Sequence, residues 1–155
     1  HIEKQDSYSG QGTLVYRQLK AADGQVFADF EDVGEKWNEA AEYITVYPNV
    51  LLGVHRDHAF AIVLVPKSTE RTVENIHLYY ATPKTNDAMR AANTEQWKLV
   101  FEEDIFVVEG MQKGRHSPNF DGGRFSAVMD SPTHCFHAWV AGKIENYRAT
   151  AQAAE

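Results

Sequence analysis

An acidic cluster interrupts an apolar helical stripe in the second half of the sequence. The stretch FEEDIFVVEGMQKG covers residues 101–114 and contains Asp104, whose neighbours at helical spacing are apolar. These neighbours are Trp97, Val100, Phe101, Val107, Val108 and Met111. A carboxylate on a buried face needs a cation, a metal or a raised pKa to offset its lost hydration. Spacing alone leaves a second interpretation open, in which the helix is partly exposed and Asp104 reaches water.

Two histidine pairs have spacings that metal ligands can use. His134 and His137 lie three residues apart in a predicted helix, but no third ligand stands at helical distance from them. His55 and His58 lie on either side of an Arg-Asp step between two predicted strands. That position predicts a surface hairpin bracketed by the two histidines and argues against a metal pair there.

A third group of polar residues lies on one predicted strand. Asn75, His77 and Tyr79 alternate along this strand and would share one face. A polar and aromatic sheet face opposite a helix that carries Asp104 is typical of a small-molecule pocket. The same three residues would equally suit a face in contact with solvent.

The elements that must position these residues are strands first and helices last. Alternation predicts strands over 13–19, 42–47, 50–55, 58–66 and 71–81, and short connections favour antiparallel neighbours. After Pro83 the period changes to about 3.6, which predicts a long helix from near Asn86 to Lys113. A last helix begins near Ser131, whose side chain would cap it. This order predicts an α+β domain in which a curved antiparallel sheet grips a long C-terminal helix.

Composition limits the classes of function. The 155 residues are 43% hydrophobic and suffice for a single domain over 1–155, in which residues 1–12 would be disordered or tag-like. A formal net charge of -7 argues against nucleic acid or an anionic membrane as the main partner. The single Cys135 excludes an internal disulfide and favours a reducing, cytoplasmic setting. The sequence contains no apolar run of roughly 18 residues, no phosphate loop and no nucleophile elbow.

Four segments, in this order, resemble one known family. They are YITVYPNVLLGVHRDHAFAIVLVP, ERTVENIHLYYA, EEDIFVVEGMQKGRHSPNF and GGRFS, and they run from about Glu42 to Ala141. The chain resembles the C-terminal catalytic domain of the large subunit of Rieske-type non-haem iron oxygenases, the aromatic-ring-hydroxylating family. It looks closest to the branch that acts on quaternary ammonium compounds. The resemblance implies a helix-grip fold of the Bet v 1/START-like type.

The resemblance also implies a mononuclear Fe(II) held by two histidines and one carboxylate. In the family this carboxylate lies in an E-D-x-x-x-x-E-x-x-Q context, which here is Glu103, Asp104, Glu109 and Gln112. Asp104 would therefore be the metal ligand, and no catalytic residue is assigned beyond it. The family's two iron-binding histidines and its Rieske 2Fe-2S cluster belong to upstream segments that this sequence does not contain. The sequence therefore predicts a catalytic fragment of a longer chain, lacking the Rieske domain and inactive alone.

For the parent enzyme, the resemblance implies a monooxygenase or dioxygenase that hydroxylates a small organic substrate. Its partners would be O2, a reductase or ferredoxin as electron donor, and further copies of itself in a homotrimer. A substrate of the choline, glycine betaine or carnitine type would be demethylated or oxidised, with aromatic rings as the competing substrate class. Aromatic side chains suit a trimethylammonium group through cation–π attraction. The candidate pocket consists of Tyr47, Asn75, His77, Tyr79, Trp97, Phe101 and Val108.

Two other classes of function stay open from the sequence. A stand-alone helix-grip module would hold a hydrophobic small molecule in a closed pocket and perform no chemistry. A structural or regulatory subunit on the same fold would have neither a metal nor a deep pocket. The position of Asp104 relative to a pocket is the first feature that bears on these classes.

Overall fold

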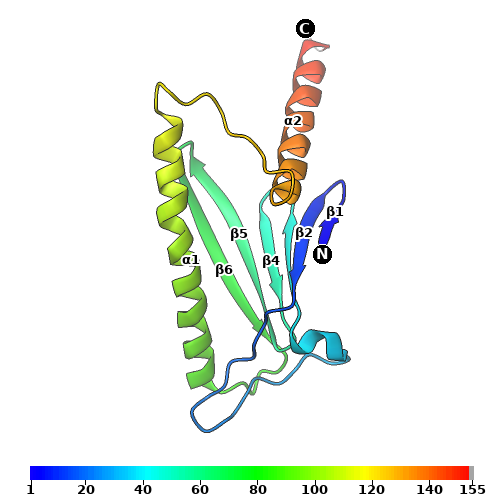
Figure 1. Ribbon diagram of the computed structural model, residues 1–155, viewed down its shortest axis with the longest axis vertical. Coiled ribbons are helices and arrows are strands. Elements are labelled where there is room, and N and C mark those ends of the chain that lie inside the picture. Colours follow the sequence, from blue (N-terminus) through cyan, green and yellow to red (C-terminus); the bar gives the residue numbers. More distant parts are fainter. Residues whose placement is uncertain (154–155) are drawn as a thin grey trace.

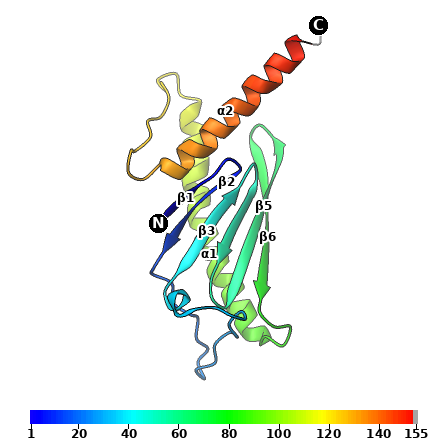
Figure 2. The same cartoon turned by 90° about the vertical axis from the view of Figure 1, so that its right-hand side faces the viewer.

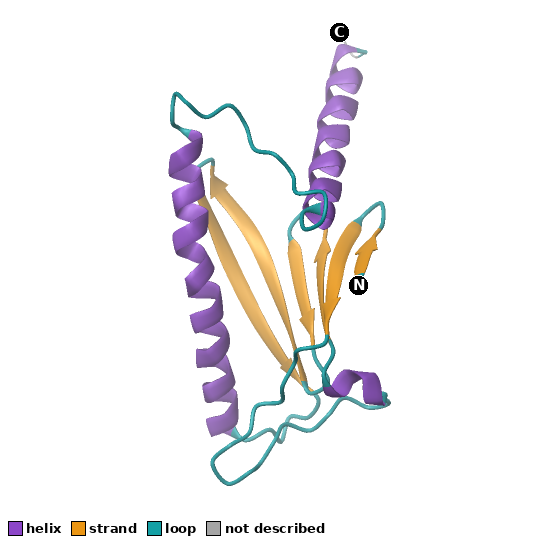
Figure 3. Ribbon diagram, in the orientation of Figure 1, coloured by secondary structure: helices purple, strands orange, loops and turns teal. Residues whose placement is uncertain are grey.

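An antiparallel meander forms the sheet in the computed structural model, which describes residues 1–153. Its six strands pair in chain order, β1-β2-β3-β4-β5-β6, and every neighbouring pair is antiparallel. The strands are β1 Ile2–Lys4, β2 Tyr8–Thr13, β3 Ala41–Val46, β4 Val50–Val54, β5 His58–Ser68 and β6 Arg71–Tyr80. A short 3-10 helix, η1 Glu35–Asn38, precedes β3, and the helices α1 Asp87–Arg115 and α2 Ser131–Gln152 follow the sheet. The predicted α+β class with a curved antiparallel sheet and a long helix is confirmed (Figures 1 and 3).

The start of the chain differs from the sequence prediction. Residues 1–12 form β1 and most of β2 instead of a disordered or tag-like segment, and the strand predicted over 13–19 is a loop after Thr13. β2 pairs with β3 through small residues, and a Cβ added at Gly10 would lie 2.5 Å from the Tyr43 carbonyl oxygen. Close approach of two backbones therefore selects glycine here, and glycine leaves no apolar alternation to detect.

The remaining strands agree with the predicted ranges within two residues. β4 and β5 pair so that Gly53 lies opposite Phe60, and β5 and β6 pair so that Phe60 lies opposite Leu78. Residues directly opposite each other in an antiparallel pair share one face of the sheet. Phe60 and Ile62 are buried on this face, which is the face that α1 covers (Figure 1).

α1 begins where the sequence predicted and packs along the sheet through one stripe. The Asn86 side chain caps the helix and accepts from the backbone N–H groups of Ala88 and Met89. The residues of the stripe lie four apart: Met89 and Asn93 are buried, and Trp97 and Phe101 are half-buried.

α2 packs across the ends of β1 and β2 and then projects beyond the sheet (Figure 2). The predicted start is correct but the predicted cap is not. Asp130 is the N-cap residue, and the Ser131 hydroxyl accepts from Lys4 Nζ at 3.0 Å. Within residues 1–153, no helix is long and apolar enough to cross a membrane.

Candidate functional site

A large cavity lies between the sheet, α1 and the start of α2, with a volume of about 1720 Å³. Its sheet wall is the face that carries Phe60 and Ile62, and its helix wall is α1 from Thr94 onward. The lining combines apolar side chains, with aromatic rings at one end, and polar or charged side chains such as Arg71, Lys113 and Arg115. The lining includes Tyr43, Leu51, Phe60, Ile62, Ile76, Leu78, Trp97, Phe101, Ile105, Val108, Met111 and Phe136. A cavity of this size and lining can hold a small organic molecule.

Asp104 lies on the wall of this cavity. It follows Phe101 by three residues and precedes Val107 and Val108, which also line the cavity. Asp104 is exposed, because the cavity is open to solvent along this part of α1. The acid in the apolar stripe is therefore hydrated in this chain and faces the space between helix and sheet.

The predicted pocket residues are divided between two parts of the molecule. Trp97, Phe101 and Val108 line the cavity together with Asp104. Asn75, His77 and Tyr79 do not: they are exposed on β6, whose alternate residues Glu74, Ile76 and Leu78 line the cavity. Alternation along β6 divided its residues between the two faces of the sheet correctly. The prediction that the Asn75, His77 and Tyr79 face lies toward the helix is wrong.

Tyr47, also predicted for the pocket, lies outside the cavity. It is buried just after β3 beneath α2, where its ring lies 5.2 Å from Phe136 and 5.5 Å from Trp139 between centroids. Its hydroxyl donates to the Ser9 Oγ at 2.8 Å, and the Ser9 hydroxyl donates to the Pro132 carbonyl at 3.3 Å. Tyr47 therefore docks α2 on the sheet.

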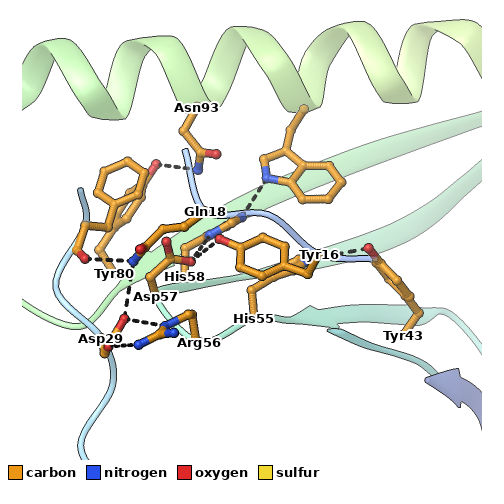
Figure 4. Close-up of polar contacts among 12 residues, drawn as sticks. Tyr16, Gln18, Asp29, Tyr43, His55, Arg56, Asp57, His58, Tyr80 and Asn93 are labelled. Carbon is orange, nitrogen blue, oxygen red and sulfur yellow. Dashed lines mark hydrogen bonds and ion pairs between the residues drawn. The ribbon is translucent and has the colours of Figure 1, made fainter. Parts of the chain in front are cut away.

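A buried polar cluster occupies the turn between β4 and β5. His55, Asp57 and His58 expose 1%, 0% and 3% of their surface, so the prediction that the two histidines bracket a surface hairpin is wrong. The loop after β2 covers this turn. Gln18 donates to the Asp29 carboxylate at 3.3 Å, and Arg56 binds the same carboxylate (Figure 4).

Hydrogen bonds connect this turn to α1. The Tyr16 hydroxyl donates to Asp57 Oδ1 at 2.5 Å, and His58 Nδ1 lies 2.8 Å from the same oxygen (Figure 4). On the other side of the imidazole ring, the Trp97 indole N–H donates to His58 Nε2 at 2.9 Å. Side chains from the loop, the turn and the helix thus form one hydrogen-bonded network.

Burial and these hydrogen bonds perturb the ionisation of the cluster. Burial, and then the nearby His58, lower the pKa of His55 to about 4. Burial alone would raise the pKa of Asp57, but the hydrogen bonds from His58 and Tyr16 outweigh it and hold that pKa below its usual value. Burial and the bond to Asp57 raise the pKa of Tyr16. At neutral pH the cluster therefore holds an ionised Asp57 beside a neutral His55 and a neutral Tyr16.

A smaller cavity of about 300 Å³ lies beside this cluster. His55 and His58 line it, and Tyr43 and Trp97 line both this cavity and the large one. Two buried atoms, His55 Nδ1 and Asp57 Oδ2, have no hydrogen-bond partner among the described residues. The aromatic end of the large cavity is thus separated from the polar cluster by two side chains, Tyr43 and Trp97.

The chain does not contain a complete metal site in the part that the structure describes. No group of three or more His, Cys, Asp or Glu side chains within residues 1–153 is arranged to hold a metal. His134 and His137 are exposed on α2, where both rings lie 5.1 Å from Phe125.

Comparison with known proteins identifies relatives of this chain. The family described as the ring hydroxylating alpha subunit (catalytic domain) matches residues 6–146. Choline monooxygenase, chloroplastic, of Arabidopsis thaliana is 29% identical over 112 residues, which cover 69% of this chain and 25% of that protein. The chain therefore spans about a quarter of the length of this relative.

Proposed function

Because the chain belongs to the ring-hydroxylating alpha subunits, whose catalytic domain it matches over residues 6–146, we propose that it forms the substrate cavity of such an oxygenase and contributes Asp104 to a mononuclear iron site. The family consists of Rieske non-haem iron oxygenases, which use oxygen, an organic substrate and an electron-transfer partner. The position of Asp104 on the wall of a cavity lined by aromatic and aliphatic side chains carries this proposal.

The ligand assignment rests on sequence context and on location. Asp104 stands in the order Glu103, Asp104, Glu109 and Gln112 that the family pattern predicts. A carboxylate on the wall of an apolar cavity is suited to a metal that also needs imidazole ligands and open positions for oxygen. The two histidines would come from outside this sequence, since the described residues supply no such set. The Rieske cluster would likewise lie outside it.

The substrate class we propose is a small quaternary ammonium compound of the choline, glycine betaine or carnitine type, which would be demethylated or oxidised. The aromatic end of the cavity brings together Tyr43, Phe60, Trp97 and Phe101. Such rings attract a desolvated trimethylammonium group by cation–π interaction, at about 2 kcal/mol or more per favourable contact. Glu74, on the facing strand, adds a carboxylate to the same cavity, which the cations Arg71 and Lys98 also line. An aromatic-ring substrate is the alternative, and it would use the rings without needing the negative charge.

The role of this chain's residues is to bind, orient and shield. The buried side chains Phe60 and Ile62 exclude water from the sheet wall of the cavity, and the rings fix the orientation of the substrate. A reductase or ferredoxin would supply electrons to the parent enzyme, which would be a homotrimer.

A binding module without catalysis is the second candidate. It is favoured by one observation: residues of this chain alone line the cavity between the sheet and the helices. Calorimetric titration of this chain with choline and with an uncharged hydrophobic ligand separates the candidates. A binding module would bind the hydrophobic ligand tightly.

Metal content of the native polypeptide tests the iron assignment. In the protein purified from its own host, Asp104→Asn is expected to lose mononuclear iron while the electron paramagnetic resonance signal of the reduced cluster stays unchanged. Glu103→Gln is the matched control, because Glu103 is the adjacent acid and does not line the cavity. Retention of mononuclear iron by the Asp104→Asn protein would remove Asp104 from the ligand set.

A further inference from the structure

The residues through which α1 packs on the sheet with buried side chains lie in the first half of the helix. Met89 and Asn93 are buried, and Trp97 and Phe101 are half-buried, whereas Ile105, Val108 and Met111, which also line the cavity, are exposed. The aromatic members of this stripe pack on β5, where the centroid of Trp97 lies 4.7 Å from that of Phe60.

Only exposed contacts are found at the far end of α1 among the described residues. Gln112 Nε2 donates to Glu70 Oε2 at 3.2 Å, and His116 Nε2 lies 3.4 Å from Glu70 Oε1. Exposed pairs of this kind contribute little to stability. The direction of the second half of α1 is therefore set by the buried contacts of the first half.

The hydrogen bond from Trp97 to His58 fixes the tautomer of the histidine. An indole nitrogen can only donate, so His58 Nε2 must be the unprotonated acceptor. The proton of the neutral ring then lies on Nδ1, which donates to Asp57 Oδ1 at 2.8 Å. Tyr16 donates to the same oxygen and keeps Asp57 ionised and in place. Each donor in this series of three hydrogen bonds meets an acceptor, so only one arrangement of protons is consistent with all three.

We propose that Asp57 and His58 are positioning residues that hold the Trp97 indole, and through it the middle of α1, at the wall of the large cavity. Asp57 fixes the tautomer of His58, and His58 fixes the orientation of the indole ring. Trp97 lines both cavities, so its orientation sets the shape of the aromatic end of the large one.

The consequence for the proposed site follows from helix geometry. Asp104 lies seven residues after Trp97, which is about 10 Å along the helix axis and on the same face. Holding Trp97 therefore sets the position of the Asp104 carboxylate over the cavity. This second step rests on the proposed function, whereas the attachment of α1 through His58 does not.

Nuclear magnetic resonance of the ¹⁵N-labelled chain tests the hydrogen bonds directly. We expect a scalar coupling between Trp97 Nε1 and His58 Nε2 across the hydrogen bond, and ¹⁵N shifts of His58 that report a proton on Nδ1. Trp97→Phe assigns the indole signal. The absence of the coupling together with a proton on Nε2 would overturn the proposal.

Spin labels test whether these bonds position α1. With Cys135 replaced by serine, labels at Phe106, which is 83% exposed on α1, and at the exposed Lys67 on β5 report their separation. We expect one narrow distance distribution, which Trp97→Phe and His58→Leu widen. His58→Gln is expected to keep it narrow, because a carboxamide oxygen can accept from the indole.

Trp139→Phe is the matched control for the spin-label experiment. Trp139 is also half-buried, and its indole makes no hydrogen bond within residues 1–153. Identical distributions in Trp97→Phe, His58→Leu and Trp139→Phe would overturn the positioning role. Should a variant fail to fold, the coupling in the unchanged chain and the His58→Gln distribution still decide. Neither experiment needs iron, so a negative result here leaves the Asp104 assignment standing, and loss of that assignment leaves the attachment of α1 standing.

Discussion

The ring of Phe60 lies over the Cα atom of Gly53 on the neighbouring strand. A Cβ added at Gly53 would come within 2.3 Å of two ring carbons of Phe60, so no other residue fits without moving the ring. The same ring packs edge-on against Trp97 and Phe101, with centroids 4.7 and 5.3 Å away. A glycine in β4 thereby allows the aromatic contact between the sheet and α1.

Gly53→Ala is expected to lower the free energy of unfolding by about 1–3 kcal/mol, because the added methyl group displaces Phe60 from its place. Urea denaturation measures the change. Gly142→Ala is the control: a Cβ there meets nothing within 4 Å, and alanine in a helix interior is expected to stabilise by about 0.5–1 kcal/mol. Equal effects in the two variants would contradict the role of the close contact.

The free energy of unfolding should decrease as the pH is lowered from about 6.5 to 4, because His55 is protonated more readily in the unfolded chain. Its pKa is about 4 in the folded chain and 6.5 without burial, so the unfolded state binds the extra proton in this window. The unfolded state is favoured as the pH falls, by on the order of 3 kcal/mol over the whole window. Urea denaturation at a series of pH values measures the slope.

Removal of the titrating group should flatten this dependence. His55→Gln is expected to reduce the slope, whereas His77→Gln, at an exposed histidine of β6, is expected to leave it unchanged. The same slope in all three proteins would show that His55 is not the group responsible.

Tyr47→Phe is expected to cost about 0.5–1.5 kcal/mol of unfolding free energy. The variant keeps the ring beside Phe136 but removes the buried hydrogen bond from the Tyr47 hydroxyl to Ser9. Thermal unfolding followed by circular dichroism measures the loss. Tyr147→Phe removes the hydroxyl of a tyrosine that is 76% exposed on α2, and it should have no measurable effect. A comparable loss in both would argue against docking of α2 through Tyr47.

Asn86→Ala should destabilise the chain by about 1 kcal/mol, since two backbone N–H groups in the first turn of α1 lose their acceptor. Asn119→Ala changes an exposed asparagine in the loop after α1 and serves as the control. Amide hydrogen exchange is expected to show the loss first at Ala88 and Met89. Unchanged exchange there would mean that the cap contributes nothing.

Local pattern predicted the elements between residues 41 and 115 because each carries its own period. β3 to β6 alternate, and α1 changes to the helical period after an asparagine cap. Its apolar stripe also predicted that Trp97, Phe101 and Val108 would share a wall with Asp104. β2 escaped detection because Gly10 is chosen for close backbone approach and carries no side chain to alternate.

The polar turn could not be predicted, because residues far away in the sequence bury it. His55, Asp57 and His58 form a hydrophilic run, and nothing nearby in the chain indicates that Tyr16 and Trp97 cover them. A period of two likewise separates the faces of β6 without saying which one meets the helix. Tertiary contacts decide both questions.

Because Trp97 lines both cavities, its fluorescence can report what occupies the large one. Of the three tryptophans, Trp97 alone lines the large cavity, while Trp37 belongs to η1 and Trp139 to α2. Replacing Trp37 and Trp139 by phenylalanine leaves one fluorophore. Its emission depends on what fills the cavity and on the hydrogen bond from its indole to His58. Occupancy of the cavity can then be followed by light in solution, without a label and before any turnover is measured.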